Sequence, residues 1–257
     1  MQDLNVTIIQ SDLVWENIDA NLSRFEDKIK TISTPTDLIV LPEMFSTGFT
    51  MQSVQYAESI NGKTIKWMAR MSQTSQAVVT GSIIIHEGGR YYNRLIWMRP
   101  DGSWTHYDKK HLFAMGGEHQ SYSAGTERLI VELKGWKICP MICYDLRFPV
   151  WARNTEDYDV LIYVANWPSV RVEHWRSLLV ARAIENQVYA IGVNRVHTDN
   201  AGNYYSGHSA IIEPQGEKLF EKAHVEVIHT HRISKIYLHK TREKLPFLMD
   251  RDTFELK

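Results

Sequence analysis

Short runs of aliphatic and β-branched residues alternate along this chain with longer segments of helical periodicity. Runs of four to eight such residues between turn-forming residues are typical of strands, whereas apolar positions three and four apart are typical of helices. Helices are predicted at residues 14–32, 64–75 and 173–187. The predicted strands occupy residues 5–10, 38–41, 77–86, 91–99, 129–133, 137–143, 160–165, 189–194, 209–213, 218–220 and 225–228. This alternation predicts an α/β fold.

Three turn signals interrupt the alternation and predict hairpins. They are Glu87-Gly88-Gly89, Pro100-Asp101-Gly102 and Glu213-Pro214-Gln215-Gly216. Because a hairpin joins antiparallel strands, the sheets should be mixed instead of purely parallel. No repeat, low-complexity tract or linker rich in proline and serine divides the 257 residues. We therefore predict one domain that spans residues 1–257 and contains two sheets.

The charge balance argues against polyanionic partners. Lys and Arg total 29 and Asp and Glu total 30, which leaves no net field to draw the protein onto nucleic acid or an acidic membrane. The segment Met1-Gln2-Asp3-Leu4 lacks the positive charge of a signal peptide, and no apolar stretch approaches the roughly 20 residues of a membrane helix. Cys139 and Cys143 form neither a redox pair nor a zinc motif. We expect a cytoplasmic protein with reduced thiols.

Two candidate catalytic groups come at the ends of predicted strands. Glu43 follows Leu38-Ile39-Val40-Leu41-Pro42, where proline ends the strand, and a carboxylate in such a loop can act as a general base. Cys143 ends the strand 137–143 and would be exposed near free backbone N–H groups, which can lower a thiol pKa and bind an oxyanion. The ordinary alternatives are a solvated glutamate and a buried structural cysteine, and Cys139 is assigned to the latter.

A third candidate lies in Tyr107-Asp108-Lys109-Lys110-His111-Leu112-Phe113. One lysine would supply a fixed cation beside the nucleophile, although a lysine pair is ordinarily a solvated surface. The physical chemistry of this segment does not choose between Lys109 and Lys110.

The sequence contains no Gly-rich phosphate loop, His-Glu-x-x-His or Gly-x-Ser-x-Gly motif. We therefore expect neither a metal ion nor an organic cofactor.

Three ordered blocks resemble the signature blocks of the nitrilase superfamily of carbon–nitrogen hydrolases. They are Leu41-Pro42-Glu43-Met44-Phe45, Asp108-Lys109-Lys110-His111-Leu112-Phe113 and Ile142-Cys143-Tyr144-Asp145-Leu146-Arg147-Phe148-Pro149. Further similarity, for example at 163–168 and 181–187, extends the resemblance from residue 5 to about residue 240. The fold that it implies is a four-layer α-β-β-α sandwich, usually assembled into dimers or larger homo-oligomers through helices that flank the sheets.

The resemblance also implies roles for individual residues. It implies Glu43 as the base, Cys143 as the nucleophile and Lys109, in preference to its neighbour, as the essential lysine. Glu118 is similar in placement to the second acidic residue of the family. The backbone N–H of Tyr144 would join Lys109 in holding the oxyanion.

The block around Cys143 resembles the omega-amidase branch, because nitrile-cleaving members typically follow the cysteine with Trp-Glu and this chain has Tyr144-Asp145. The branch implies hydrolysis of the terminal amide of 2-oxo dicarboxylic acid monoamides such as 2-oxoglutaramate and 2-oxosuccinamate. From loop position, Trp167, Arg171 and Arg195 are candidates to bind the negative end of the substrate, while the alternative for each arginine is a surface salt bridge. The alternatives are another small carboxamide, an N-carbamoyl compound, or a catalytically silent scaffold of the same fold.

Overall fold

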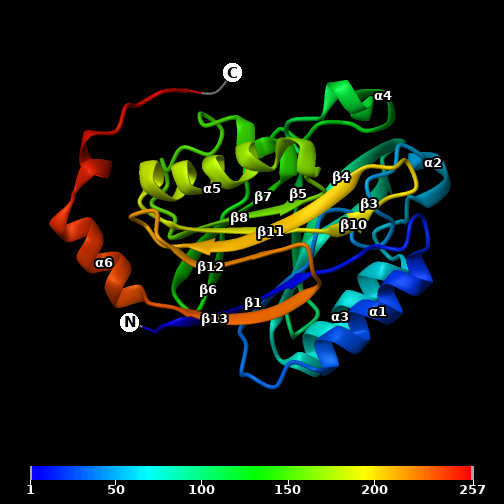
Figure 1. The fold of residues 1–257 in the computed structure, drawn as a ribbon, viewed down its shortest axis with the longest axis horizontal. Coiled ribbons are helices and arrows are strands. Elements are labelled where there is room, and N and C mark those ends of the chain that lie inside the picture. Colours follow the sequence, from blue (N-terminus) through cyan, green and yellow to red (C-terminus); the bar gives the residue numbers. More distant parts are fainter. Residues whose placement is uncertain (1, 256–257) are drawn as a thin grey trace.

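Two β-sheets lie face to face between helices in the computed structural model, which describes residues 2–255 (Figure 1). The first sheet has the order β13 (Val227–Ile233), β1 (Leu4–Gln10), β2 (Leu38–Val40), β3 (Val78–Glu87), β4 (Arg90–Met98) and β5 (Trp104–Asp108). The second has the order β10 (Val196–Thr198), β11 (Tyr204–Ile212), β9 (Tyr189–Asn194), β8 (Val160–Ala165), β7 (Trp136–Ile142) and β6 (Val131–Leu133), with β12 (Lys218–Ala223) also paired to β11. The α-helices are α1 (Ile18–Lys30), α2 (Ser53–Tyr56), α3 (Lys63–Ser75), α4 (Glu118–Ser121), α5 (Val172–Asn186) and α6 (Lys235–Lys244).

Alternating side chains in the central strands divide the core into layers. In β1, Leu4, Val6 and Ile8 belong to the core between the two sheets, whereas Ile9 belongs to the core that α1 and α3 cover. This division follows from the period of two along a strand, which sends neighbouring side chains to opposite faces. On the far side, α5 packs on β9 and β11 (Figure 1). The predicted four-layer α-β-β-α sandwich is confirmed.

Both sheets are mixed, as the turn signals predict. β1, β2 and β3 run parallel, as do β7, β8 and β9, while the other strand pairs within residues 2–255 are antiparallel. The three predicted hairpins connect β3 to β4, β4 to β5 and β11 to β12. Loops that follow the carboxyl ends of parallel strands gather at one edge, where open α/β sheets usually bind their ligands.

Local interactions explain where the predicted elements differ from the observed ones. α1 begins at Ile18, four residues after the predicted start, because the Asn17 side chain accepts a hydrogen bond from the Ala20 N–H (3.0 Å) and caps the helix. The hydrophobic pattern does not predict β5, β10 or α6, since polar side chains interrupt the apolar pattern in all three. None of the helices in residues 2–255 is long and apolar enough to cross a membrane.

Candidate active site

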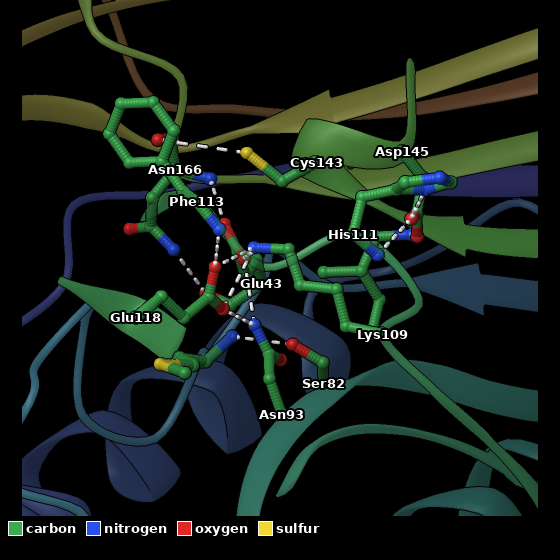
Figure 2. Close-up of polar contacts among 12 residues, drawn as sticks. Glu43, Ser82, Asn93, Lys109, His111, Phe113, Glu118, Cys143, Asp145 and Asn166 are labelled. Carbon is green, nitrogen blue, oxygen red and sulfur yellow. Dashed lines mark hydrogen bonds and ion pairs between the residues drawn. The ribbon is translucent and has the colours of Figure 1, made fainter. Parts of the chain in front are cut away.

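Glu43, Lys109 and Cys143 come together between the sheets, just after the ends of β2, β5 and β7 (Figure 2). Pro42 has no N–H to continue the β2 ladder, so the chain leaves the sheet directly before Glu43. The exposed fraction is 0% for Glu43, 1% for Lys109 and 9% for Cys143. The structure thus places the three predicted residues in one buried cluster.

Glu43 is held by donors from three other segments of the chain. Its Oε1 accepts hydrogen bonds from Lys109 Nζ and Asn93 Nδ2, each at 2.8 Å, and its Oε2 accepts from the Asn166 N–H at 2.8 Å. The Asn166 side chain also donates to the Glu43 backbone carbonyl at 2.6 Å. These bonds fix the carboxylate in one orientation without solvent around it.

Lys109, and not Lys110, belongs to this cluster. Its Nζ contacts Glu43 and lies 2.9 Å from each carboxylate oxygen of Glu118, whereas the Lys110 ammonium lies over the Trp151 ring at 5.2 Å. Burial by itself lowers the pKa of Lys109, but the carboxylates of Glu118 and Glu43 outweigh burial and raise that pKa above its ordinary value. Lys109 is therefore a permanent cation at neutral pH.

Glu118 is the second carboxylate on the same ammonium. It also accepts hydrogen bonds from the Phe113 N–H (2.6 Å) and from Asn93 Nδ2 (3.2 Å). Burial raises the pKa of Glu118, and the nearby Glu43 carboxylate adds to the rise, which Lys109 only partly offsets. Glu118 thus shares the Lys109 ammonium with Glu43.

Cys143 starts a short 3-10 turn (Cys143–Arg147) with a φ of +42°, in the left-handed region that non-glycine residues rarely adopt. Such strain is typical of functional sites. The N–H of Tyr144 belongs to the first turn, where no intrahelical acceptor is available. The sulfur lies 3.9 Å from the carbonyl oxygen of Asn166 (Figure 2). The Cys143 thiol, the Glu43 carboxylate and the Tyr144 N–H therefore meet at this turn.

The Cys143 thiol is protonated at rest, which corrects the expectation from sequence. Burial raises the pKa of Cys143 well above its ordinary value, and Glu43 raises it further, while Lys109 opposes them only in part. The expected effect of the backbone N–H groups is outweighed because the sulfur lies inside the protein and not at its surface. Burial also raises the pKa of Cys139 to about 12, in keeping with a structural cysteine.

A cavity of about 280 Å³ opens onto Cys143 and Lys109. Trp167 and Arg171, two of the predicted substrate-binding residues, line it, and so does Tyr144. Polar side chains and rings dominate the walls, so the cavity suits a small polar molecule. Among residues 2–255, no group of three or more His, Cys, Asp or Glu side chains is arranged to hold a metal ion.

Arg195, the third predicted substrate-binding residue, does not line this cavity. Its buried guanidinium donates from Nη2 to Asp12 Oδ1 (3.1 Å) and lies 4.7 Å above the Tyr205 ring. Because this cation already has a carboxylate partner and a supporting ring, it stabilises the wall behind Tyr205. The structure therefore removes Arg195 from the substrate-binding residues.

Three site residues were not singled out by the sequence. Arg147 lines the cavity with its guanidinium 4.7 Å above the Trp167 ring, and Asn166 and Asn93 hold Glu43. Arg147 and Asn166 belong to stretches that carry the family resemblance, so a signal for them was present. Asn93 lies within β4, where nothing in the local sequence marks it.

Residues 5–233, which include every residue of this site, match the carbon–nitrogen hydrolase family. The chain belongs to the carbon–nitrogen hydrolase family. The family predicted from the three sequence blocks is thereby confirmed.

This carbon–nitrogen hydrolase resembles known enzymes along its whole length. It is 45% identical over 258 residues to the omega-amidase YafV of Escherichia coli strain K12, with 100% of each chain covered. It is 33% identical to the 2-oxoglutaramate amidase of Bacillus subtilis strain 168, with 95% of this chain and 96% of that protein covered. The crystal structure of XC1258 from Xanthomonas campestris, a CN-hydrolase superfamily protein with an arsenic adduct in its active site, matches with a TM-score of 0.98, 39% identity and full coverage of both chains.

Proposed function

We propose that this carbon–nitrogen hydrolase is an omega-amidase that releases ammonia from 2-oxoglutaramate, 2-oxosuccinamate and similar monoamides. The observation that carries the proposal is the cavity itself, which is lined by Cys143 and Lys109 and also by Arg147 and Arg171. The first pair suits the reacting amide of such a substrate, and the two arginines suit its carboxylate. The full-length similarity to an omega-amidase and to a 2-oxoglutaramate amidase supports the same substrate class.

In the first half of the reaction, the Cys143 sulfur bonds to the amide carbon as the thiol proton passes to Glu43. A base beside the sulfur is needed because the thiol pKa is raised. The carbonyl oxygen becomes an oxyanion that the Lys109 ammonium and the Tyr144 N–H stabilise. Glu43 then gives the proton to the amide nitrogen, the carbon–nitrogen bond breaks, and ammonia leaves a thioester on Cys143.

In the second half, Glu43 takes a proton from water as the water oxygen attacks the thioester carbon. The same two donors stabilise the second oxyanion. The carbon–sulfur bond breaks, the sulfur recovers its proton from Glu43, and the dicarboxylic acid leaves. Lys109 has three N–H donors, so two of them can hold the carboxylates of Glu43 and Glu118 while the third turns to the oxyanion.

Arg147 and Arg171 bind the substrate carboxylate. The Arg147 guanidinium rests on the Trp167 ring at 4.7 Å, and Arg171 stands over the Phe113 ring at 5.5 Å, so aromatic rings support both cations at the cavity. The Trp167 indole donates to the Arg171 carbonyl (2.8 Å), which fixes the ring on which Arg147 rests. A guanidinium matches the geometry of a carboxylate with two parallel hydrogen bonds.

Residues 1–257 form one domain, and the active unit is a homodimer or larger homo-oligomer of it. The enzyme works in the cytoplasm. Exposed apolar side chains on and near the flanking helices α5 and α6 support self-association: Ile184, Ile236 and Phe247 have exposed fractions of 48%, 51% and 60%. Two free cysteines suit a reducing compartment. Sedimentation analysis of the purified chain tests the assembly, and a monomer at micromolar concentration would contradict it.

Steady-state ammonia release from 2-oxoglutaramate and 2-oxosuccinamate tests the substrate assignment. We expect turnover of both, with a higher kcat/KM than for neutral amides of equal length. Preferred turnover of N-carbamoyl compounds or of another small carboxamide would replace this assignment within the same family. Absence of turnover on every amide would favour a catalytically silent scaffold.

A further inference from the structure

Asp145, two residues after Cys143, has a buried carboxylate that is surrounded by four hydrogen-bond donors. Its Oδ2 accepts from the Tyr107 hydroxyl (2.8 Å) and the Ile142 N–H (3.1 Å). Its Oδ1 accepts from the backbone N–H (3.0 Å) and the ring Nδ1 (2.8 Å) of His111 (Figure 2). A buried carboxylate with this many donors is held in one orientation. None of the proposed hydrolytic steps uses this group.

The donors belong to the two chain segments that carry Lys109 and Cys143. Tyr107 lies two residues before Lys109 and His111 lies two residues after it, so the carboxylate holds both flanks of the lysine. Asp145 itself lies two residues after Cys143. The carboxylate therefore bridges the end of β5 in the first sheet and the end of β7 in the second.

The partners of Asp145 are themselves fixed. The Tyr107 oxygen accepts from Trp151 Nε1 at 3.0 Å, and the His111 ring stacks on Phe148 with centroids 3.7 Å apart and planes at 7°. None of Tyr107, His111 and Asp145 is among the residues that line the cavity at Cys143. They lie outside the wall of the cavity and do not contact a substrate bound there.

We propose that Asp145, through Tyr107 and His111, is a positioning residue that sets the separation between the Lys109 ammonium and the Cys143 sulfur. The proposal rests on the proposed role of Lys109 in holding the oxyanion. A displacement of about 1 Å between reacting groups can cost about 10²-fold in rate. An interaction made only in the transition state changes kcat and leaves KM nearly unchanged.

The test changes the partners, because Asp145→Asn would turn an N–H₂ group toward donors and can prevent folding. His111→Ala removes the ring donor, whereas His111→Asn places an amide N–H near the position of Nδ1. Tyr107→Phe removes the hydroxyl donor. The matched control is Tyr189→Phe. It removes a tyrosine hydroxyl at the start of β9 that is hydrogen-bonded to the Ser234 backbone, and Tyr189 does not line the cavity at Cys143.

Two reagents separate oxyanion positioning from general damage to Cys143. Acylation by p-nitrophenyl acetate passes through an oxyanion and releases p-nitrophenolate, whereas iodoacetamide alkylates the sulfur by displacing iodide and forms no oxyanion. We expect His111→Ala and Tyr107→Phe to slow acylation about 10- to 100-fold while alkylation stays within about threefold of wild type. His111→Asn should recover most of the acylation rate, and Tyr189→Phe should behave as wild type.

An equal loss with both reagents, no loss with either, or no recovery in His111→Asn would overturn the inference. Wild-type protein that is acylated by p-nitrophenyl acetate but does not hydrolyse 2-oxoglutaramate would contradict the proposed substrate, while the same comparison of variants still decides the role of Asp145. Wild-type protein whose Cys143 reacts with neither ester nor amide would overturn both.

Discussion

The Lys109 ammonium lies 2.8 Å from Glu43 Oε1, and the exposed fractions of the two side chains are 1% and 0%. Water and salt screen a pair this deeply buried far less than a surface ion pair. The same ammonium contacts Glu118 at 2.9 Å, so one cation serves two carboxylates. The site therefore holds a fixed positive charge between two carboxylates.

Replacing Lys109 by methionine should slow acylation of Cys143 by at least about 10²-fold, because one oxyanion donor is lost. The change also leaves the Glu43 and Glu118 carboxylates without their cation, which should lower the free energy of unfolding by about 3–5 kcal/mol. Rapid-quench mass spectrometry of the acyl adduct and denaturant unfolding measure the two effects. Lys110→Met is the matched control, and a slower reaction in Lys110→Met than in Lys109→Met would reverse the assignment.

Cys143→Ala should be folded and inactive, whereas Cys139→Ala should keep most of its activity. Only Cys143 lies beside a base and a cation, while Cys139 is fully buried in β7 with its pKa raised by burial. Ammonia release and thermal melting of both variants provide the measurement. Activity of Cys143→Ala equal to wild type would end the covalent mechanism.

Arg147→Met should raise KM for 2-oxoglutaramate about 10- to 100-fold, since a charge-assisted hydrogen bond contributes about 1.5–3 kcal/mol. Arg171→Met should have a smaller effect, because Arg147 is held more firmly, by Trp167 beneath it and by two contacts of 3.3 Å to His174. Initial rates over a range of substrate concentrations give both values. A neutral amide of equal length should respond little to either change; an equal response would argue against carboxylate binding.

Glu221 should contribute to stability at neutral pH and lose that contribution in acid. Burial by itself raises its pKa, but hydrogen bonds from Arg176, Lys218 and His208 outweigh burial and lower the pKa from 4.5 to about 2. A carboxyl group with a depressed folded-state pKa stabilises the fold above about pH 4.5, and the contribution disappears as the pH falls toward 2. In Glu221→Gln, the free energy of unfolding should therefore change less steeply with pH across this interval. Identical slopes in the two proteins would contradict the prediction.

Most of the strands could be predicted because the signal for them is local, whereas the four layers were implied only by the family resemblance. The alternation at Leu4, Val6 and Ile8 marks a strand face wherever it occurs, and the turns at 87–89, 100–102 and 213–216 need no distant partner. The strand 104–108, with Thr105, His106 and Asp108, and the polar helix 235–244 lack such a signal. Their pairing and packing partners elsewhere in the fold stabilise them.

By itself, the sequence determined the family, through three ordered blocks, and with it the candidates Glu43, Lys109 and Cys143. Only the tertiary structure decided that Arg195 pairs with Asp12, that Arg147 lines the cavity, and that the Cys143 thiol has a raised pKa. The reason is distance along the chain: Glu43 is 66 positions from Lys109 and 123 from Asn166. Burial and charge at such a site depend on which distant segments meet there, and no local pattern contains that information.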